Sequence, residues 1–267
     1  MSIKNYKVAA ALAIFCTLLW GTAFPFIKVG YAQFGIEGND IGSKLLFAGA
    51  RFTLAGIMVL FIFLVKNKHL PKIEKNGIMP VMLLGSVQTF GQYIFTYIGI
   101  GFTSGANTSV ITACATFFTV LFAPLFFKSD KLNICKIIGC VLGFCGVLCV
   151  NSGGGVTVDT LFGGILLLIA GFVTGGKLDF SSIKALLVLL WLAFVSAAAF
   201  AIWTALLKHH PASRICVFNL LVPVFGTLLS GIMLGESVFG IETIISVVLI
   251  CAGIFISNMQ IKKRCER

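Results

Sequence analysis

Arg51 lies inside a long apolar run, Leu45–Val65. A charge within a membrane-spanning helix is costly, so such a side chain usually faces a cavity, a partner or the membrane interface. The Arg51 guanidinium could bind a carboxylate through parallel hydrogen bonds, as arginine commonly does. It could equally reach the interface near Lys44 or bind carbonyl groups at helix ends, which would be a structural role. Residue type and position leave both interpretations open.

Polar side chains gather in two further apolar runs, Gly77–Ile100 and Ala106–Phe127. Several are four residues apart and therefore share a helix face: Gln88 and Gln92, Thr89 and Tyr93, Thr108 and Thr112, and Thr112 and Thr116, with Asn107 nearby. Such a face could line a hydrated cavity, or it could join helices through hydrogen bonds worth about 0.6 kcal/mol each. Gln88 and Gln92 are the strongest candidates for contact with a substrate.

Aromatic residues and one proline add further candidates. Trp20 and Phe24 could stack on a substrate, whereas Trp191 and Trp203 lie nearer the ends of their run and could anchor it at the interface. Asn219 and Pro223 interrupt the run Ile215–Leu234, which predicts either a broken helix beside a binding site or a plain kink. The candidate substrate-binding residues are Trp20, Phe24, Arg51, Gln88, Gln92, Tyr93, Asn107, Thr112, Asn219 and Pro223.

Catalytic and metal-binding patterns find little support. The three histidines lie in loops, no carboxylate lies in the middle of an apolar run, and the nine cysteines include no CxxC pair. Without a buried acid–base pair or a ligand cluster, the sequence predicts neither an enzyme nor a metal or other cofactor. The same lack of buried carboxylates disfavours a carboxylate proton relay.

Composition identifies the elements that must position these residues. Hydrophobic residues make up 58% of the 267, charged residues 11%, and the mean hydropathy is +1.05. A soluble domain has roughly 45–50% apolar and about 25% charged residues, so this chain cannot cover a water-facing surface. Long apolar runs exclude an outer-membrane barrel and predict an all-α polytopic membrane protein. The net charge of +11 falls in loops, so no nucleic-acid partner is expected.

Charged residues divide the chain into eight expected full spans. Each is long enough to cross a hydrocarbon core of about 30 Å: Val8–Ile27, Leu45–Val65, Gly77–Ile100, Ala106–Phe127, Leu132–Val150, Ala185–Leu207, Ile215–Leu234 and Val238–Asn258. The leftover run Leu161–Val173 would form only about 20 Å of helix and is expected not to span.

Charge bias gives the expected topology. With a cytoplasmic amino terminus and a leftover run that does not cross, 15 of the 20 Lys and Arg residues lie inside, 4 outside and 1 within a span. If the leftover run crossed, the split would be 11 inside and 8 outside. The positive-inside rule favours the first arrangement. The sequence therefore predicts a multi-pass protein of the cytoplasmic membrane with both termini in the cytoplasm.

The chain also contains an internal repeat. A shift of 106 residues pairs Ala106–Lys131 with Ala212–Ser237, and a shift of 107 pairs Gly146 with Gly253. Because the first half has an odd number of spans, the second half starts on the opposite side, which is an inverted-topology repeat. The second half is incomplete, since Gly163–Val173 corresponds only to Ala55–Val65 and nothing corresponds to the first span.

Motifs along most of the chain resemble the EamA-type branch of the drug/metabolite transporter superfamily. They are Leu19-Trp20-Gly21-Thr22-Ala23-Phe24, Ala50-Arg51-Phe52, Thr103-Ser104-Gly105-Ala106-Asn107, Pro223-Val224-Phe225, and Leu234-Gly235-Glu236 followed by Gly253. The resemblance implies two inverted five-helix repeats that export or exchange small metabolites, often amino acids. The chain departs from that pattern by lacking the sixth span and the first half of the seventh.

Together these observations predict three regions: a first five-helix repeat at 1–151, a second, incomplete repeat at 152–260, and a basic cytoplasmic tail at 261–267. The expected function is secondary transport of small polar metabolites, such as amino acids or other carboxylates, by alternating access. The alternative is a non-transporting scaffold or an inactive deletion form. Expected partners are a small-molecule substrate and the lipid bilayer, and a homodimer could supply the missing wall.

Overall fold

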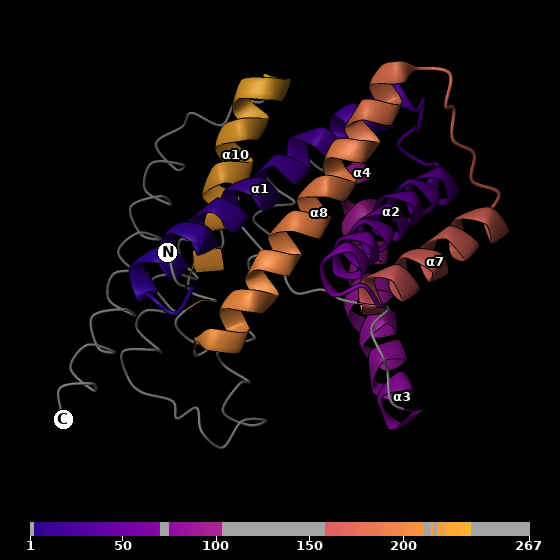
Figure 1. The fold of residues 1–267 in the computed structure, drawn as a ribbon. Coiled ribbons are helices and arrows are strands. Elements are labelled where there is room, and N and C mark those ends of the chain that lie inside the picture. The colour runs from indigo at the N-terminus through magenta and orange to yellow at the C-terminus, as the bar shows by residue number, and fades with distance from the viewer. Residues whose placement is uncertain are drawn as a thin grey trace, which may run out of the picture. The chain divides into compact units, whose positions relative to one another are not determined.

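The computed structural model describes residues 3–69, 75–102, 158–210, 215, 218–219 and 221–235, and every regular element in these ranges is helical. The helices are α1 (Tyr6–Gln33), α2 (Ile41–Asn67), α3 (Lys75–Leu84), the π-helix η1 (Gly85–Gly91), α4 (Gln92–Phe102), α7 (Val158–Val173), α8 (Ile183–His209) and α10 (Leu221–Leu234) (Figure 1). The all-α class expected from the sequence is therefore confirmed for this part of the chain, whereas the number of spans and the inverted repeats stay predictions.

Within the described ranges, three helices are long and apolar enough to cross a membrane: Tyr6–Gln33, Ile41–Val65 and Ile183–His209. They contain the predicted spans Val8–Ile27, Leu45–Val65 and Ala185–Leu207. Helices suit this solvent because each satisfies its backbone hydrogen bonds internally, which lipid cannot do. The predicted spans Ala106–Phe127, Leu132–Val150 and Val238–Asn258 lie outside the described residues.

Two predicted spans are interrupted in the structure. The third is helical from α3 to α4 but passes through the π-helix η1. In the predicted span Ile215–Leu234, Phe218 and Asn219 form a short 3₁₀ turn and α10 starts only at Leu221. Pro223 explains the break, because it has no N–H to donate to the carbonyl of Asn219 and its ring crowds that carbonyl.

The leftover run forms α7, which has 16 residues and begins before the predicted limit of Leu161. A helix of this length extends only about 24 Å, less than the hydrocarbon core. α7 is accordingly not among the helices long enough to cross.

The chain divides into two compact units. Unit 1 contains Met1–Pro25, Ser104–Gly153 and Ala205–Arg267, and unit 2 contains Phe26–Thr103 and Gly154–Thr204. Each unit takes segments from both sequence halves, and α1 and α8 contribute to both units. The units are spatial groupings and the repeat is a sequence relationship, so the repeat boundary after residue 151 stays a prediction.

Unit 2 is built on a close antiparallel pair of helices, α2 and α7 (Figure 1). Glycine permits this approach: a Cβ on Gly164 would lie 2.5 Å from the backbone nitrogen of Thr53, and one on Gly171 would lie 2.5 Å from that of Leu46. The paired positions run in opposite directions along the two helices: Gly42 with Gly176, Leu46 with Gly171, Gly49 with Leu168, and Thr53 with Gly164. We call these residues the glycine seam.

The amino-terminal end of α2 is fixed by side-chain hydrogen bonds. Asp40 is the N-cap residue, and its carboxylate accepts a 2.8 Å hydrogen bond from the Ser43 backbone nitrogen. Hydrogen bonds from the Ser43 hydroxyl and backbone hold the pKa of Asp40 below its usual value. The Ser43 hydroxyl oxygen also accepts from the backbone nitrogen of Lys177, 2.8 Å away, which ties the segment after α7 to the start of α2.

In unit 1, the first part of α1 packs against α10. A Cβ on Gly21 would lie 2.6 Å from the Cβ of Phe225, so the two helices approach closely at that glycine. Close approach through small residues is typical of membrane helices. This contact places the motif around Trp20 and Gly21 beside the motif around Pro223.

Candidate substrate-binding site

α2 directs two different faces to its neighbours in unit 2. The glycine seam occupies positions 42, 46, 49 and 53 and faces α7. Lys44, Phe47 and Arg51 are spaced three and four residues apart and therefore share another face of α2. That face carries Arg51 into the interior of unit 2, where its side chain is only 3% exposed.

Arg51 joins three helices through hydrogen bonds. Its Nε donates to the carbonyl oxygen of Leu192 at 3.2 Å and to the hydroxyl oxygen of Ser196 at 3.0 Å, both on α8. Its Nη1 donates to the hydroxyl oxygen of Tyr97 on α4 at 2.8 Å. These contacts fix the plane of the guanidinium, and they agree with the structural role as well as with a binding role.

A group of aromatic rings lies beside this guanidinium. Its Cζ lies 5.0 Å from the ring centre of Phe52, and the Phe52 ring lies 4.2 Å from that of Tyr93. Tyr97 joins the same group and accepts a 2.8 Å hydrogen bond at its backbone oxygen from the hydroxyl of Tyr31. We define the aromatic cluster as Tyr31, Phe47, Phe52, Tyr93 and Tyr97.

Part of the Arg51 guanidinium remains available for a ligand. Among the described residues, its hydrogen-bond partners are a carbonyl and two hydroxyl groups, and no carboxylate pairs with it. A guanidinium has five N–H donors, so those of Nη2 and one of Nη1 have no acceptor in this part of the chain. A buried positive charge without a counter-ion is costly and favours an anion at this position.

The sequence candidates in unit 2 are only partly brought together. Tyr93 lies in the aromatic cluster beside Phe52, as part of the Arg51 surroundings. Gln92 is half-buried at the start of α4, and its backbone oxygen accepts from the hydroxyl of Thr96 at 3.0 Å. The side chain of Gln88, and Asn107 and Thr112 entirely, lie outside the described residues.

The remaining candidates lie in unit 1. Trp20 and Phe24 are buried on α1, and Pro223 is buried in the first turn of α10. Asn219 is 7% exposed, and its side-chain oxygen has no hydrogen-bond partner within the described part of the chain. Asn219 and Pro223 lie at the start of α10, and Gly21, next to Trp20, approaches Phe225 of the same helix.

Sequence reasoning did not find several residues of the site. Tyr97 is four residues after Tyr93, so the same helix-face argument could have included it. Ser196 is an isolated polar residue within a long apolar helix, which is a weak signal. In the sequence, Phe52 stands out only as part of the Ala50-Arg51-Phe52 motif, and Tyr31 lies after the expected first span, so neither is predicted as a site residue. Lys44 seemed a surface charge by sequence, yet it is buried.

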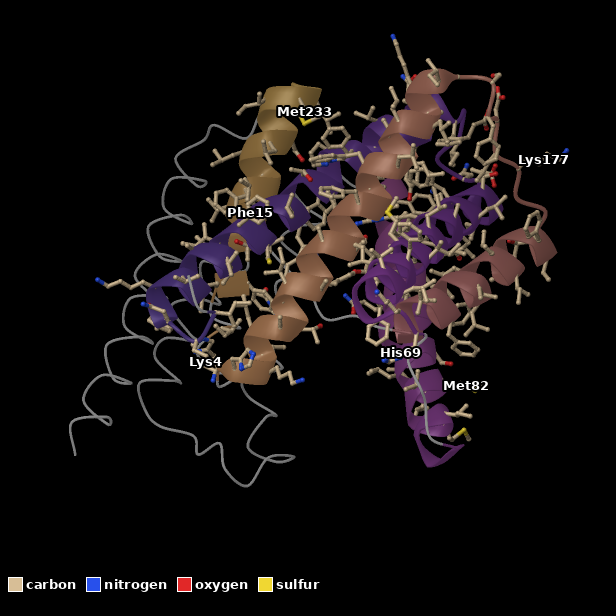
Figure 2. The ribbon with its side chains drawn as sticks, viewed as in Figure 1. Lys4, Phe15, His69, Met82, Lys177 and Met233 are labelled. Carbon is tan, nitrogen blue, oxygen red and sulfur yellow. The ribbon has the colours of Figure 1, made fainter. Side chains whose placement is uncertain are left out.

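The described ranges contain no candidate metal centre. There, no three His, Cys, Asp or Glu side chains gather closely enough to hold a metal ion. Figure 2 places His69 beyond the end of α2 and Lys177 beyond the end of α7. The features that stand out in unit 2 are therefore buried cations and aromatic rings on membrane-type helices.

Such apolar helices with buried polar groups are typical of integral membrane proteins. The EamA-like transporter family matches residues 7–152 and again residues 155–259. The chain therefore belongs to the EamA-like transporter family. The second matched stretch is shorter than the first.

Two relatives that align over most of their length carry transporter names. The chain is 25% identical to the "uncharacterized transporter YoaV" of Bacillus subtilis (strain 168) over 291 aligned positions, covering 93% of this chain and 96% of YoaV. It is 27% identical to the "probable amino-acid metabolite efflux pump" of Salmonella typhimurium (strain LT2) over 307 positions, covering 95% of each chain. Both aligned lengths exceed 267 residues, so segments of both relatives have no counterpart in this chain.

A third relative and a solved structure extend the comparison. The "uncharacterized inner membrane transporter YedA" of Escherichia coli (strain K12) is 28% identical over 155 residues, covering 57% of this chain and 46% of YedA. One crystal structure, described only as that of a protein, superposes with a TM-score of 0.67 at 17% identity, covering 97% of this chain and 99% of the other. That likeness concerns the fold alone.

Proposed function

We propose that this protein is a secondary carrier that exports or exchanges small carboxylate-bearing metabolites, such as amino acids, across the cytoplasmic membrane. The observation that carries the proposal is the buried Arg51 guanidinium, which has no carboxylate partner among the described residues and keeps unused donors. Membership of the EamA-like transporter family supports a transport function, and the buried Arg51 guanidinium supports a substrate that carries an anionic group.

The remaining contacts of Arg51 orient it for this task. Leu192, Ser196 and Tyr97 hold the Nε edge and one side of Nη1, which leaves the Nη2 end free to form a bidentate pair with a carboxylate. The aromatic cluster offers apolar surface for the rest of the substrate. The name of the Salmonella relative supports amino acids as the first class to test.

The substrate would cross the membrane by alternating access. In inverted-repeat carriers two halves rock around a site near the membrane midplane. The predicted repeats 1–151 and 152–260 would be these halves. Charge bias supports cytoplasmic termini, because 15 of the 20 basic residues then lie inside.

The experiment is a flux assay on purified protein in proteoliposomes. Each of the twenty radiolabelled L-amino acids is loaded inside, and efflux is compared with protein-free vesicles and with the Arg51→Leu variant. The proposal expects at least one amino acid to leave faster through the wild-type protein than through either control. Efflux equal to that of protein-free vesicles for all twenty would contradict an amino-acid carrier.

A second candidate function is a non-transporting scaffold or an inactive deletion form. The specific observation in its favour is that the aligned lengths of two relatives exceed this chain, together with the shorter second family match. The absent segment would leave one side of a cavity open, unless a second copy of the chain supplied the wall.

A splicing experiment separates these alternatives. A copy of the absent one and a half spans, taken from a full-length relative, is inserted after residue 157, and efflux is compared at matched membrane levels. The deletion hypothesis expects faster efflux from the restored chain. Equal efflux from the restored chain and from a monomeric short chain would eliminate the deletion hypothesis. Equal efflux from a short chain that can be crosslinked as a dimer would show that the second copy supplies the missing side of the cavity.

A further inference from the structure

Lys44 is a second buried cation in unit 2. It lies in the first turn of α2, and its side chain is 0% exposed. A cation near the amino terminus of a helix opposes the helix dipole, so this position is unfavourable on local grounds. A buried lysine whose charge is unfavourable for its own helix therefore points to a role other than stabilising that helix.

No carboxylate of the described residues forms an ion pair with Lys44, although Asp40, four residues earlier, interacts with it electrostatically. Its Nζ donates to the carbonyl oxygen of Gly38 and lies 4.6 Å from the ring centre of Phe102 and 6.0 Å from that of Tyr31. The carboxylate of Asp40 accepts from the backbone of Ser43 instead. An ammonium has three donors, so two of them have no oxygen acceptor in the described part of the chain.

The backbone makes room for this side chain. A Cβ on Gly101 would collide with Lys44 Nζ, so glycine at the end of α4 is what allows the ammonium to lie there. The carbonyl oxygen of loop residue Gly38 accepts a hydrogen bond from the same ammonium. The ammonium thus binds one carbonyl oxygen and lies near two aromatic rings.

Lys44 and Arg51 are aligned along one face of α2. Seven residues separate them, which puts them about 10 Å apart along the helix and within about 20° of the same direction. Phe47 lies between them, and its ring packs 5.8 Å from the ring centre of Tyr31 and 6.2 Å from that of Tyr97. Tyr31 lies near the Lys44 ammonium and also binds the backbone of Tyr97, whose hydroxyl accepts from Arg51.

We propose that Lys44 is a second binding position for the anionic group of the substrate, to which a carboxylate passes from Arg51 on its way to the membrane face where α2 begins. This inference rests on the proposed function, because it assigns a further step to the same carrier. The carboxylate would displace the Gly38 carbonyl from the ammonium, and the aromatic surface of Phe47 and Tyr31 would line the path.

The test compares binding and exchange in proteoliposomes for the wild-type protein and for Lys44→Gln, Lys44→Arg and Lys177→Gln, using the radiolabelled L-amino acid that the wild type moves fastest. Lys177 is the matched control, because it is an exposed cation whose backbone is tied to the start of α2. We expect Lys44→Gln to slow exchange about tenfold while equilibrium affinity changes less than about threefold, as loss of one charged contact off the main site should.

The conservative variant separates charge from structure. Lys44→Arg should recover most of the exchange rate, and Lys177→Gln should match the wild type. Exchange by Lys44→Gln at the wild-type rate would overturn the proposal. Loss of binding, exchange and melting temperature together in both Lys44 variants would assign Lys44 a purely structural role and would also overturn it.

A second measurement does not depend on the substrate. Lys44→Cys is introduced into a chain whose nine native cysteines are replaced, and cells are treated with an anionic or a cationic methanethiosulfonate reagent of similar size. The proposal expects faster modification by the anionic reagent and loss of this preference on adding Arg51→Gln. Equal rates for both reagents would overturn the Lys44 proposal even if amino-acid flux is observed, and absent flux alone would overturn only the proposed function.

Discussion

The glycine seam predicts that one added methyl group at Gly164 will destabilise the protein. Gly164 is buried on α7, and its two nearest contacts across the seam are backbone atoms: a Cβ would lie 2.5 Å from the nitrogen of Thr53 and 2.8 Å from the carbonyl carbon of Phe52. Trimming a side chain on α2 cannot relieve a clash with backbone. The Gly164→Ala variant must therefore move α7 away from α2.

The size of the effect follows from these distances. Ordinary contact begins near 3.4 Å, so the helices must separate by about 1 Å at this point. Overpacking of this kind costs about 1–3 kcal/mol, and separation also weakens the contacts at Gly171 and Gly49. Alanine favours a helix over glycine by up to about 1 kcal/mol, which offsets part of the cost. We expect a net loss of about 1–2 kcal/mol in the free energy of unfolding.

Gly99→Ala is the matched control. Gly99 is also helical, but a Cβ there would meet no heavy atom of the described residues within 4 Å. Its variant should be as stable as the wild type or slightly more stable, because only the propensity gain remains. The assay is the melting temperature of each purified variant in the same detergent, where about 1 kcal/mol corresponds to a few degrees for a chain of this size. If Gly164→Ala melts at or above the temperature of Gly99→Ala, α2 and α7 are not in backbone contact.

Three further predictions concern the site, the end of α2 and the topology. Tyr97→Phe removes the hydroxyl that accepts from Arg51, so amino-acid affinity should fall by about 1 kcal/mol with little change in melting temperature; unchanged affinity in equilibrium binding would count against the site. Because the pKa of Asp40 is lowered in the folded state, its capping stabilisation, at most about 1 kcal/mol, should be complete above the ordinary carboxyl pKa and lost as pH falls through the lowered value. The Asp40→Asn variant should show no such loss in melting temperature between neutral and acidic pH. Single cysteines placed at Asn151 and Lys184 should be labelled from the same side of the membrane; labelling from opposite sides would show that the intervening segment crosses.

The helical framework could be predicted from the sequence because its physical cause is local. A run such as Leu45–Val65 has few alternatives to a membrane helix, since every backbone group must be satisfied without water. The break near Asn219 was also predictable, because a proline four residues later removes a specific hydrogen bond. The extra turn at the start of α7 was not, because end residues depend on neighbours rather than on the apolar pattern.

The site was predictable only where a residue is unusual in its own segment. Arg51 stands out because a charge in an apolar run is costly. Its partners Ser196 and Tyr97 are distant in sequence, and nothing in either helix alone indicates that they meet Arg51. Lys44 is the clearest case: its position near a predicted span end indicates a surface charge, and only the packing of Gly101 and Gly38 around it shows that it is buried.

The central claim is that the Arg51 guanidinium binds the carboxylate of the transported molecule. Equilibrium binding of the amino acid that the wild type exports fastest tests it most directly, measured for wild type, Arg51→Lys and Arg51→Leu at matched amounts of folded protein. The account predicts that Arg51→Lys binds about tenfold more weakly, because it keeps the charge but loses the planar fork, and that Arg51→Leu binds more weakly still. Equal affinity of Arg51→Lys and Arg51→Leu would contradict it, because leucine cannot pair with an anion.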